Sequence, residues 1–355
     1  MANRKKKRRS GLLANIAFSI ITVISLTALI VVLLTNIRMS DEINIYKSRT
    51  EELNEYKNTH LYTEKDLESQ AEKIREEENL REKNLLLEQI KETMDNGYSA
   101  YYMLRAIFPD QVVVFSDDGY NFYPISDEIG KNNYVTENFI QDEETEEITY
   151  VDDNKNILSK KGIDVSSFNG EIDWNKVAKS DVDFAYIRCG LRGSTEGKLM
   201  LDSTFETNIK EASKTNIPIG VYFFTQAVNE NEADEEAKFL IEQIKDYKID
   251  YPIALDIENL EGRTEGLSKE QRTKNAIVFL SELEAEGYKT IIYGNLNSLF
   301  NMLNLEDLEA YDKWFAYYNY PVYNPYNYSI WQYTSKGEID GIKGNVDINV
   351  CMKNY

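Results

Sequence analysis

Two carboxylates, Asp256 and Glu258, lie on the same face of a predicted strand, in the stretch Tyr251-Pro-Ile-Ala-Leu-Asp-Ile-Glu-Asn259. Side chains alternate between two faces along a strand, and the opposite face of this one is wholly aliphatic. An edge strand with a solvated acidic face also explains an isolated Asp-x-Glu pair. The helical patterns on both sides instead favour a parallel α/β strand with its acids at the carboxyl end, where catalytic sites of such folds lie.

Two further acids also lie on the inward face of a predicted strand. Asp164 lies between outward aliphatic residues in Gly162–Ser166, and Asp347 does so in Asn345–Asn349. Taken singly, each is explained as a turn or cap residue. Because the first and last strands of a barrel are neighbours, we expect all four carboxyls at one rim, where mutual repulsion raises the pKa of at least one. That arrangement suits a proton donor beside an ionised partner.

Composition excludes other chemistries. His60 is the only histidine, so Ser-His-Asp and Cys-His hydrolysis and zinc sites are not expected, and we predict neither a metal nor a cofactor. The formal net charge of −21 argues against nucleic acid as a partner. Cys189 and Cys351 either pair in an oxidising compartment or remain free thiols.

Regular alternation of strands and helices begins at Lys161 and predicts an α/β fold over 161–355. Five β/α units precede three bare strands, which indicates a TIM-like barrel trimmed of its last helices. The predicted strands are 162–166, 183–189, 217–225, 252–258, 290–294, 313–318, 329–334 and 346–350, and the predicted helices are 174–178, 203–215, 230–246, 268–286 and 296–308.

Aromatic residues lie in or beside these strands, and some of them must be core. A saccharide site also needs ring faces for stacking and acids for the glycosidic bond. The candidate substrate-binding residues are Tyr222, Tyr293, Trp331 and Tyr317.

The N-terminal part predicts a membrane anchor. Residues 1–10 are basic, and residues 11–35 form an apolar stretch without a charge, long enough for a transmembrane helix. A signal peptide is the alternative, but its apolar region is shorter and ends in a cleavage site of small residues. The basic cluster predicts a cytoplasmic N-terminus, a single pass through the cell membrane and an extracellular catalytic domain.

Residues 40–96 contain neither proline nor glycine, and this stretch predicts one long helical stalk that ends at Gly97. Apolar residues recur at heptad spacing at one of the two seam positions, so a coiled-coil homodimer and a solvated single-helix spacer both remain open. Residues 97–140 predict a small aromatic α+β segment with a β-hairpin, and residues 141–160 predict an acidic linker.

Residues 162–355 resemble the glycoside hydrolase family 25 lysozymes. The resemblance rests on an ordered set of motifs: Gly162-Ile-Asp-Val-Ser166, Phe184-Ala-Tyr-Ile-Arg188, Gly220-Val-Tyr222, Ala254-Leu-Asp-Ile-Glu258, Trp331-Gln-Tyr333 and Val346-Asp-Ile-Asn349.

The resemblance implies a (β/α)5β3 barrel that cleaves the β-1,4 bond after N-acetylmuramic acid in peptidoglycan. By position, Glu258 would be the general acid/base, and Asp256 would stabilise the transition state or orient the substrate acetamido group. Asp164 and Asp347 would be supporting acids, and Tyr222 a substrate contact. Phe223 departs from the family, in which many members carry histidine, and this puts fine substrate preference in question.

Two alternatives remain. Chitinase-like barrels also carry an Asp-x-Glu pair, but their longer acidic run is absent, since Tyr251, Ile253 and Ala254 stand where its acids would begin. A non-catalytic glycan-binding scaffold of a wall-assembly complex is the other alternative, and the intact set of acids argues against it.

Overall fold

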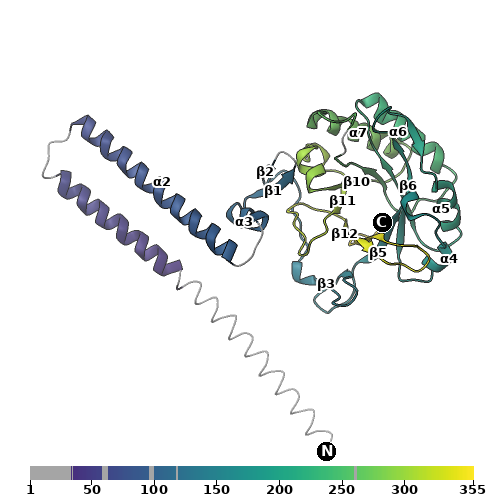
Figure 1. The fold of residues 1–355 in the computed structure, drawn as a ribbon, viewed down its shortest axis with the longest axis horizontal. Helices are drawn as coiled ribbons and strands as arrows, with labels where there is room; N and C mark the ends of the chain where they lie inside the picture. The colour runs from purple at the N-terminus through teal and green to yellow at the C-terminus, as the bar shows by residue number, and fades with distance from the viewer. Residues whose placement is uncertain (1–32, 34, 58–62, 96–99, 117–118, 260–261) are drawn as a thin grey trace, which may run out of the picture. The chain divides into compact units, whose positions relative to one another are not determined.

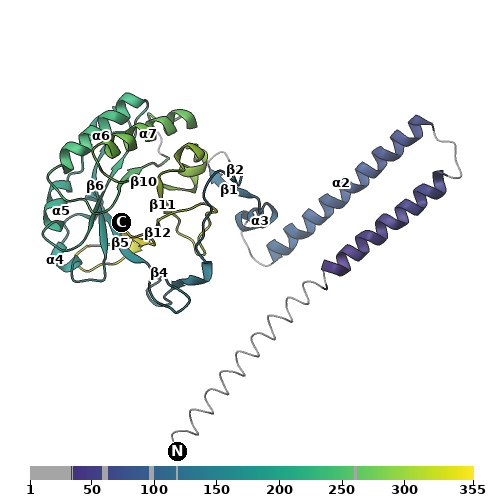
Figure 2. The same cartoon turned by 180° about the vertical axis from the view of Figure 1, so that it is seen from behind.

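The chain divides into two units, Met1–Lys91 and Glu92–Tyr355, in a computed structural model of the protein (Figures 1 and 2). The structure describes residues 33, 35–57, 63–95, 100–116, 119–259 and 262–355.

A closed barrel of eight strands forms the body of the second unit. In order around the barrel they are β5 (Lys160–Val165), β6 (Phe184–Arg192), β8 (Ile219–Phe224), β9 (Ile253–Asp256), β10 (Thr290–Asn295), β11 (Asp312–Ala316), β12 (Ile330–Gly337) and β13 (Val346–Cys351). Neighbours from β5 to β12 are parallel, whereas β13 is antiparallel to both β12 and β5. A short strand that we did not predict, β7 (Leu199–Leu201), pairs with the end of β6. The predicted α/β barrel is confirmed.

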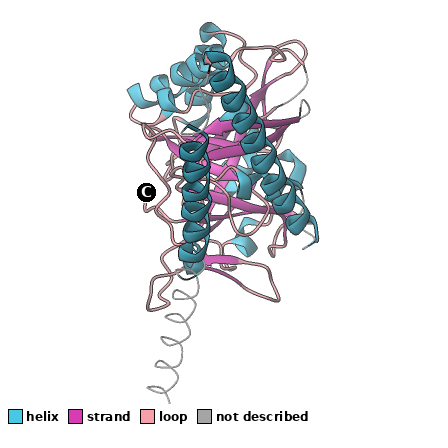
Figure 3. Cartoon of the chain, turned by 90° about the vertical axis from the view of Figure 1, so that its left-hand side faces the viewer, coloured by secondary structure: helices cyan, strands magenta, loops and turns pink. Residues whose placement is uncertain are grey.

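Helices pack around the outside of the strands (Figure 1), and Figure 3 colours the helices cyan and the strands magenta. They are α4 (Trp174–Val177), α5 (Phe205–Ala212), α6 (Glu230–Ile244) and α7 (Lys269–Ala285), with short turns η2 (Ser167–Asn169), η3 (Asn297–Asn301) and η4 (Glu306–Leu308). Ser268 caps α7 by accepting from the Gln271 N–H at 3.2 Å. The predicted helix 296–308 is instead two short turns, and residues 311–355 contain no helix.

Alternation along the strands separates two cores. Outward aliphatic side chains pack under the helices, and inward aromatic ones fill the barrel below its carboxyl-end rim. In this inner core Phe184 stacks on Tyr251 at 4.4 Å, and Tyr186 lies 4.4 Å from Trp314. Gly162 faces the same space, and a Cβ there would lie 2.1 Å from the Phe184 ring, so the large rings require glycine at this position. The aromatic residues therefore form a solid floor beneath the rim.

The predicted β-hairpin is present before the barrel. Helix α3 (Ala100–Ile107) leads into β1 (Gln111–Ser116), which pairs antiparallel with β2 (Gly119–Pro124). Tyr323 lies in the loop between β11 and β12, and its hydroxyl accepts from the Val113 N–H at 3.1 Å. The hairpin is thus part of the same unit as the barrel.

The segment that we expected to be a linker, 141–160, is folded against the barrel. Turn η1 (Thr136–Asn138) leads into β3 (Phe139–Gln141), which pairs antiparallel with β4 (Ile148–Tyr150). The Phe139 ring packs edge-on against Trp331 at 5.4 Å. The apolar residues of this hairpin lie in an otherwise acidic stretch, and they pack against the barrel. The hairpin therefore covers part of the barrel.

The helical part of the first unit is interrupted, contrary to our prediction of one helix over 40–94. Residues 35–57 are helical, Thr63 is not, and α2 spans Glu64–Asp95. The Thr63 N–H donates to Asp66 Oδ2 at 2.9 Å, and this cap begins a new helix. Arg49 pairs with Glu77 at 3.5 Å, so the two helical segments contact each other.

The predicted membrane span, 11–35, lies almost entirely outside the described residues. Within the part of the chain that the structure describes, we find no helix that is long and apolar enough to cross a membrane.

Candidate active site

The structure brings the four predicted acids together at one rim of the barrel. Asp256 is the last residue of β9 and Glu258 follows two positions later. Asp164 and Asp347 are register partners across the antiparallel pair β5–β13, so the end of one strand meets the start of the other. The four carboxyls are close enough to perturb one another's pKa values.

Asp164 lies at the centre of a hydrogen-bond network. Its Oδ2 accepts from Gln332 Nε2 at 2.9 Å and from Asn349 Nδ2 at 2.8 Å. Gln332 Oε1 in turn accepts from the hydroxyls of Tyr293 and Tyr318, at 2.8 and 2.7 Å. These hydroxyl donors fix the Gln332 amide so that its N–H groups face Asp164.

Asn349 is oriented in the same way from the aromatic floor. Its Oδ1 accepts from Trp314 Nε1 at 2.7 Å, which turns its amide N–H group toward Asp164. Burial raises the pKa of Asp164 to about 6, while these two amide donors oppose the rise by stabilising the carboxylate. Asp164 is therefore the ionised member of the cluster at neutral pH.

The same surroundings raise the pKa values of Asp347 and Glu258. Burial and the charges of Asp164 and Glu258 raise the pKa of Asp347 to about 8. Burial, followed by the charge of Asp164, also raises the pKa of Glu258. Since repulsion disfavours a second negative charge beside Asp164, these surroundings favour the protonated forms of its neighbours.

Asp256 is buried, and its Oδ1 has no hydrogen-bond partner among the described residues. Burial, together with the charges of Glu258 and Asp164, raises the pKa of Asp256 well above its usual range. Asp164, which accepts two amide hydrogen bonds, is thus the acid whose surroundings favour ionisation, whereas burial and neighbouring charges disfavour the ionised form of Asp256. A buried acceptor without a donor is costly, and a substrate N–H can satisfy it.

Arg188 is a site residue that our sequence analysis did not select. It pairs with Asp202 at 2.7 Å, donates to Ser167 Oγ at 3.0 Å, and opposes the pKa rise of both Asp256 and Glu258. Arg188 points inward because it has the same parity as Phe184 and Tyr186 on β6, and that signal was present in the sequence.

Of the four predicted substrate-binding aromatics, two face the site. Tyr222 and Tyr293 lie above Trp314, at 6.3 and 4.9 Å between ring centroids, and burial beside the carboxyls raises both hydroxyl pKa values.

The other two do not reach the site. Trp331 is fully buried in the outer core, on the side of its strand that faces away from the barrel interior. Its Nε1 donates to the Tyr317 carbonyl at 2.7 Å. Tyr317 lies in the same outer layer, and its hydroxyl accepts from Arg105 at 2.8 Å. Their neighbours in sequence, Gln332 and Tyr318, have the opposite parity and occupy the site. Both were missed.

Phe223, at the position where the resemblance expects histidine, is fully buried among the outer-layer rings of Phe239 and Phe279. It does not line the site, so this departure leaves the carboxyl cluster unchanged. Cys189 and Cys351 are both buried free thiols.

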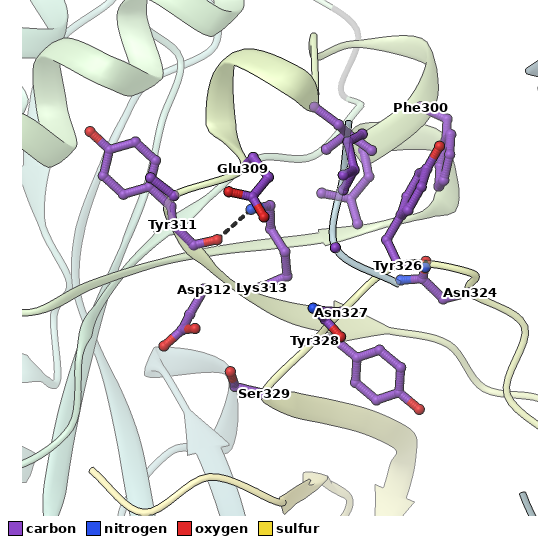
Figure 4. Close-up of a pocket in the computed structure, with 15 residues that line it drawn as sticks. Phe300, Glu309, Tyr311, Asp312, Lys313, Asn324, Tyr326, Asn327, Tyr328 and Ser329 are labelled. Atoms are coloured by element: carbon purple, nitrogen blue, oxygen red, sulfur yellow. Dashed lines mark hydrogen bonds between the residues drawn. The ribbon is translucent and has the colours of Figure 1, made fainter. Parts of the chain in front are cut away.

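A separate cavity of about 310 Å³ lies at the other end of the barrel, around the start of β11 (Figure 4). Lys313 projects beside it and donates to the carbonyls of Leu308 and Tyr311. Because these carbonyls hold its ammonium, the lysine has a structural role in this cavity, away from the carboxyl cluster.

Comparison with known proteins relates this barrel to a family. The sequence profile of the glycosyl hydrolases family 25 matches residues 163–342. The uncharacterized protein YegX of Escherichia coli K12 is 31% identical over 199 residues, which cover 53% of this chain and 68% of YegX. The autolytic lysozyme of Clostridium acetobutylicum is 30% identical over 192 residues, 53% of this chain and 55% of that lysozyme.

A solved structure shares the fold. The Clostridium perfringens spore cortex lytic enzyme SleM matches with a TM-score of 0.50 at 24% identity, over 57% of this chain and 69% of SleM. The family profile spans half of the chain, from within β5 almost to β13. The chain therefore belongs to glycosyl hydrolases family 25 and is a glycoside hydrolase.

Proposed function

We propose that the protein is a cell-wall lysozyme that hydrolyses the β-1,4 bond between N-acetylmuramic acid and N-acetylglucosamine in peptidoglycan. The observation that carries this proposal is the carboxyl cluster, in which Glu258, with a raised pKa, lies beside Asp164, whose carboxylate accepts two amide hydrogen bonds. Glycosidases need a carboxylic acid and a carboxylate flanking the scissile bond. A relative named autolytic lysozyme supports the choice of substrate.

Glu258 is the proton donor in this mechanism. It is half-buried at the mouth of the barrel, and its pKa is raised, so it can protonate the glycosidic oxygen as the bond breaks. The ionised Asp164 supplies the negative charge that an oxocarbenium-like transition state attracts.

Asp256 orients the substrate. Its buried Oδ1 needs a donor, and the acetamido N–H of an N-acetylhexosamine provides one. A sugar without this group leaves the acceptor unpaired, which favours N-acetylated substrates. Asp347 is a supporting acid beside Asp164, and Tyr222 is a substrate contact beside Trp314.

The reducing ends of the products test this assignment. The full-length chain is incubated with purified peptidoglycan, and the products are reduced with borohydride. New muramitol ends support a muramidase, glucosaminitol ends indicate another N-acetylhexosamine-specific glycosidase, and the absence of new ends favours the glycan-binding scaffold.

Replacing Glu258 tests the acid. Glu258→Gln keeps the shape but removes the transferable proton, so the rate should fall by about 10²–10⁴-fold. Circular dichroism checks that the variant folds. Cleavage at the parent rate by a folded Glu258→Gln variant contradicts the role of Glu258.

We further propose that residues 11–35 anchor the protein in the cell membrane with the barrel outside the cell. The basic residues before the apolar stretch motivate this orientation. Protease added to intact cells should remove the barrel and leave the N-terminal tail. A barrel protected inside the cell contradicts the proposal.

The stalk is proposed to act as a spacer or to pair two copies. Its exposed Tyr46 and Leu53 stand at heptad spacing within the helical segment 35–57, which motivates the pairing. Sedimentation of the full-length chain in detergent distinguishes a dimer from a monomer, and a monomer at high concentration leaves the spacer alone.

A further inference from the structure

Phe168 is the most exposed of the large apolar side chains that the structure describes, with 90% of its surface accessible. Single exposed apolar residues are common on protein surfaces and need no explanation by themselves. This one lies in η2, the turn that directly follows β5 and Asp164. Whether the exposed ring has a function therefore depends on where it lies relative to the carboxyl cluster.

Contacts place the ring beside the site. The guanidinium carbon of Arg188 lies 5.0 Å from the centroid of the Phe168 ring. Arg188 is also the cation whose charge acts on Asp256 and Glu258. The phenyl ring consequently stands at the edge of the carboxyl cluster, with most of its surface open.

The backbone around Phe168 is fixed by reciprocal hydrogen bonds. Ser166 Oγ accepts from the Phe168 N–H at 3.3 Å, and the Ser166 N–H donates to Asn169 Oδ1 at 2.9 Å. The Ser167 N–H donates to Asp202 Oδ2 at 3.1 Å, and Asp202 is the partner of Arg188. The ring is therefore displayed by a rigid turn, which lowers the entropy lost when a ligand binds to it.

We propose that Phe168 is a stacking platform for a hexosamine ring of the glycan, next to the residues that are cleaved. This inference rests on the proposed function, because it assumes that the cluster binds a glycan. The apolar face of a pyranose matches an exposed phenyl ring in size and polarity, while the charged stem peptides of peptidoglycan do not. Phe168 thus determines affinity and leaves the chemistry to Glu258.

Tyr318 is the other exposed ring near the carboxyls, but it is a poorer probe. It is 53% exposed, and its hydroxyl donates to Gln332, which donates to Asp164. Removing Tyr318 changes the carboxyl network as well as the groove surface. Phe168 contributes no side-chain hydrogen bond, so its removal leaves the carboxyl network intact and loses only the contact of the ring with Arg188.

The test compares full-length Phe168→Ala, Phe168→Leu and Phe168→Trp with the parent on purified peptidoglycan. Phe115→Ala is the matched control, since Phe115 is 59% exposed on β1. We expect the apparent KM to rise about two- to ten-fold in the Ala and Leu variants, the worth of one aromatic contact, with kcat changed little. The Trp variant and the control should keep the parent KM.

Binding without turnover separates the two proposals. In a Glu258→Gln background, Phe168→Ala should weaken sedimentation with both intact peptidoglycan and glycan strands freed of stem peptides by an amidase. Loss on intact peptidoglycan alone assigns Phe168 to the peptide and overturns the stacking of a sugar. An unchanged KM, or a fall in kcat alone, also overturns it. A parent enzyme that produces no new ends refutes the proposed function instead.

Discussion

Asn349 and Gln332 donate their side-chain amides to the same oxygen of Asp164, Oδ2, at 2.8 and 2.9 Å. Each amide is oriented by aromatic donors on its other side, the Trp314 indole for Asn349 and two tyrosine hydroxyls for Gln332. The two neutral amides therefore stabilise the ionised form of Asp164, while burial and repulsion raise the pKa values of the neighbouring acids.

Asn349→Ala should raise the pKa of Asp164 above about 6, because the carboxylate loses one of its two donors. Less Asp164 is then ionised at neutral pH, so the acidic limb of the pH–rate profile moves to higher pH. Asn156→Ala, an exposed substitution between β4 and β5, is the control. An acidic limb at the parent pH shows that Asp164 does not control it.

Asp347→Asn should stabilise the protein and impair catalysis. The folded pKa of about 8 lies above the usual 3.8, so between these values the unfolded chain releases a proton that the folded chain keeps. Stability contributed by the neutral Asp347 is complete below pH 3.8 and is lost as pH rises toward 8. Asparagine cannot ionise, so the variant does not lose this stability as the pH rises.

The gain in Tm should thus be absent near pH 4 and grow up to pH 8, where each kcal/mol shifts Tm by roughly 2–4 °C. Thermal unfolding across this range measures it. Glu338→Gln, on an exposed carboxyl at the other end of the β12–β13 turn, serves as control. A gain that is equal at all pH values contradicts the assignment of the proton to Asp347.

Arg188→Met should abolish most activity and destabilise the barrel, because it leaves Asp202 buried without its cation. Breaking such a pair costs about 3–5 kcal/mol. The double variant Arg188→Met/Asp202→Asn removes both charges, so it should recover stability in urea but not the rate of cleavage. Recovery of both shows that Arg188 only balances Asp202.

Phe139→Ala should destabilise the barrel by about 3–5 kcal/mol, since Phe139 is buried against Trp331. Ile140→Ala is the matched control, because the next side chain is 40% exposed. Urea unfolding measures both. Equal midpoints for the two variants contradict a covering role for the β3–β4 hairpin.

The alternation of side chains along the strands explains which site residues could be predicted from the sequence. Parity identified Asp164, Asp256 and Asp347 as inward residues, and the carboxyl ends of parallel strands brought them together. The same rule, applied to Trp331 and Tyr317, assigns them to the outer layer, and we chose them for their chemistry instead. Applied consistently it selects Arg188, Gln332 and Asn349.

Other features depend on contacts that no local pattern reveals. The β3–β4 hairpin is acidic in composition, and only its fit against Trp331 shows that it is part of the fold. The ionised member of the cluster is set by amides from β12 and β13, so its identity requires the register of strands far apart in sequence. The Thr63 cap was readable, since Thr-x-x-Asp is a start signal, but heptad spacing across it obscured the break.

The pairing of β5 with β13 has a consequence for how the enzyme comes into being. These are the first and last strands of the barrel, so Asp164 and Asp347 meet only when its longest-range contact forms. Such non-local pairing slows folding, because the entropy of loop closure is lost before the contact forms. A nascent or half-folded chain accordingly lacks an assembled catalytic centre. We therefore expect a chain whose barrel has not closed to lack hydrolase activity.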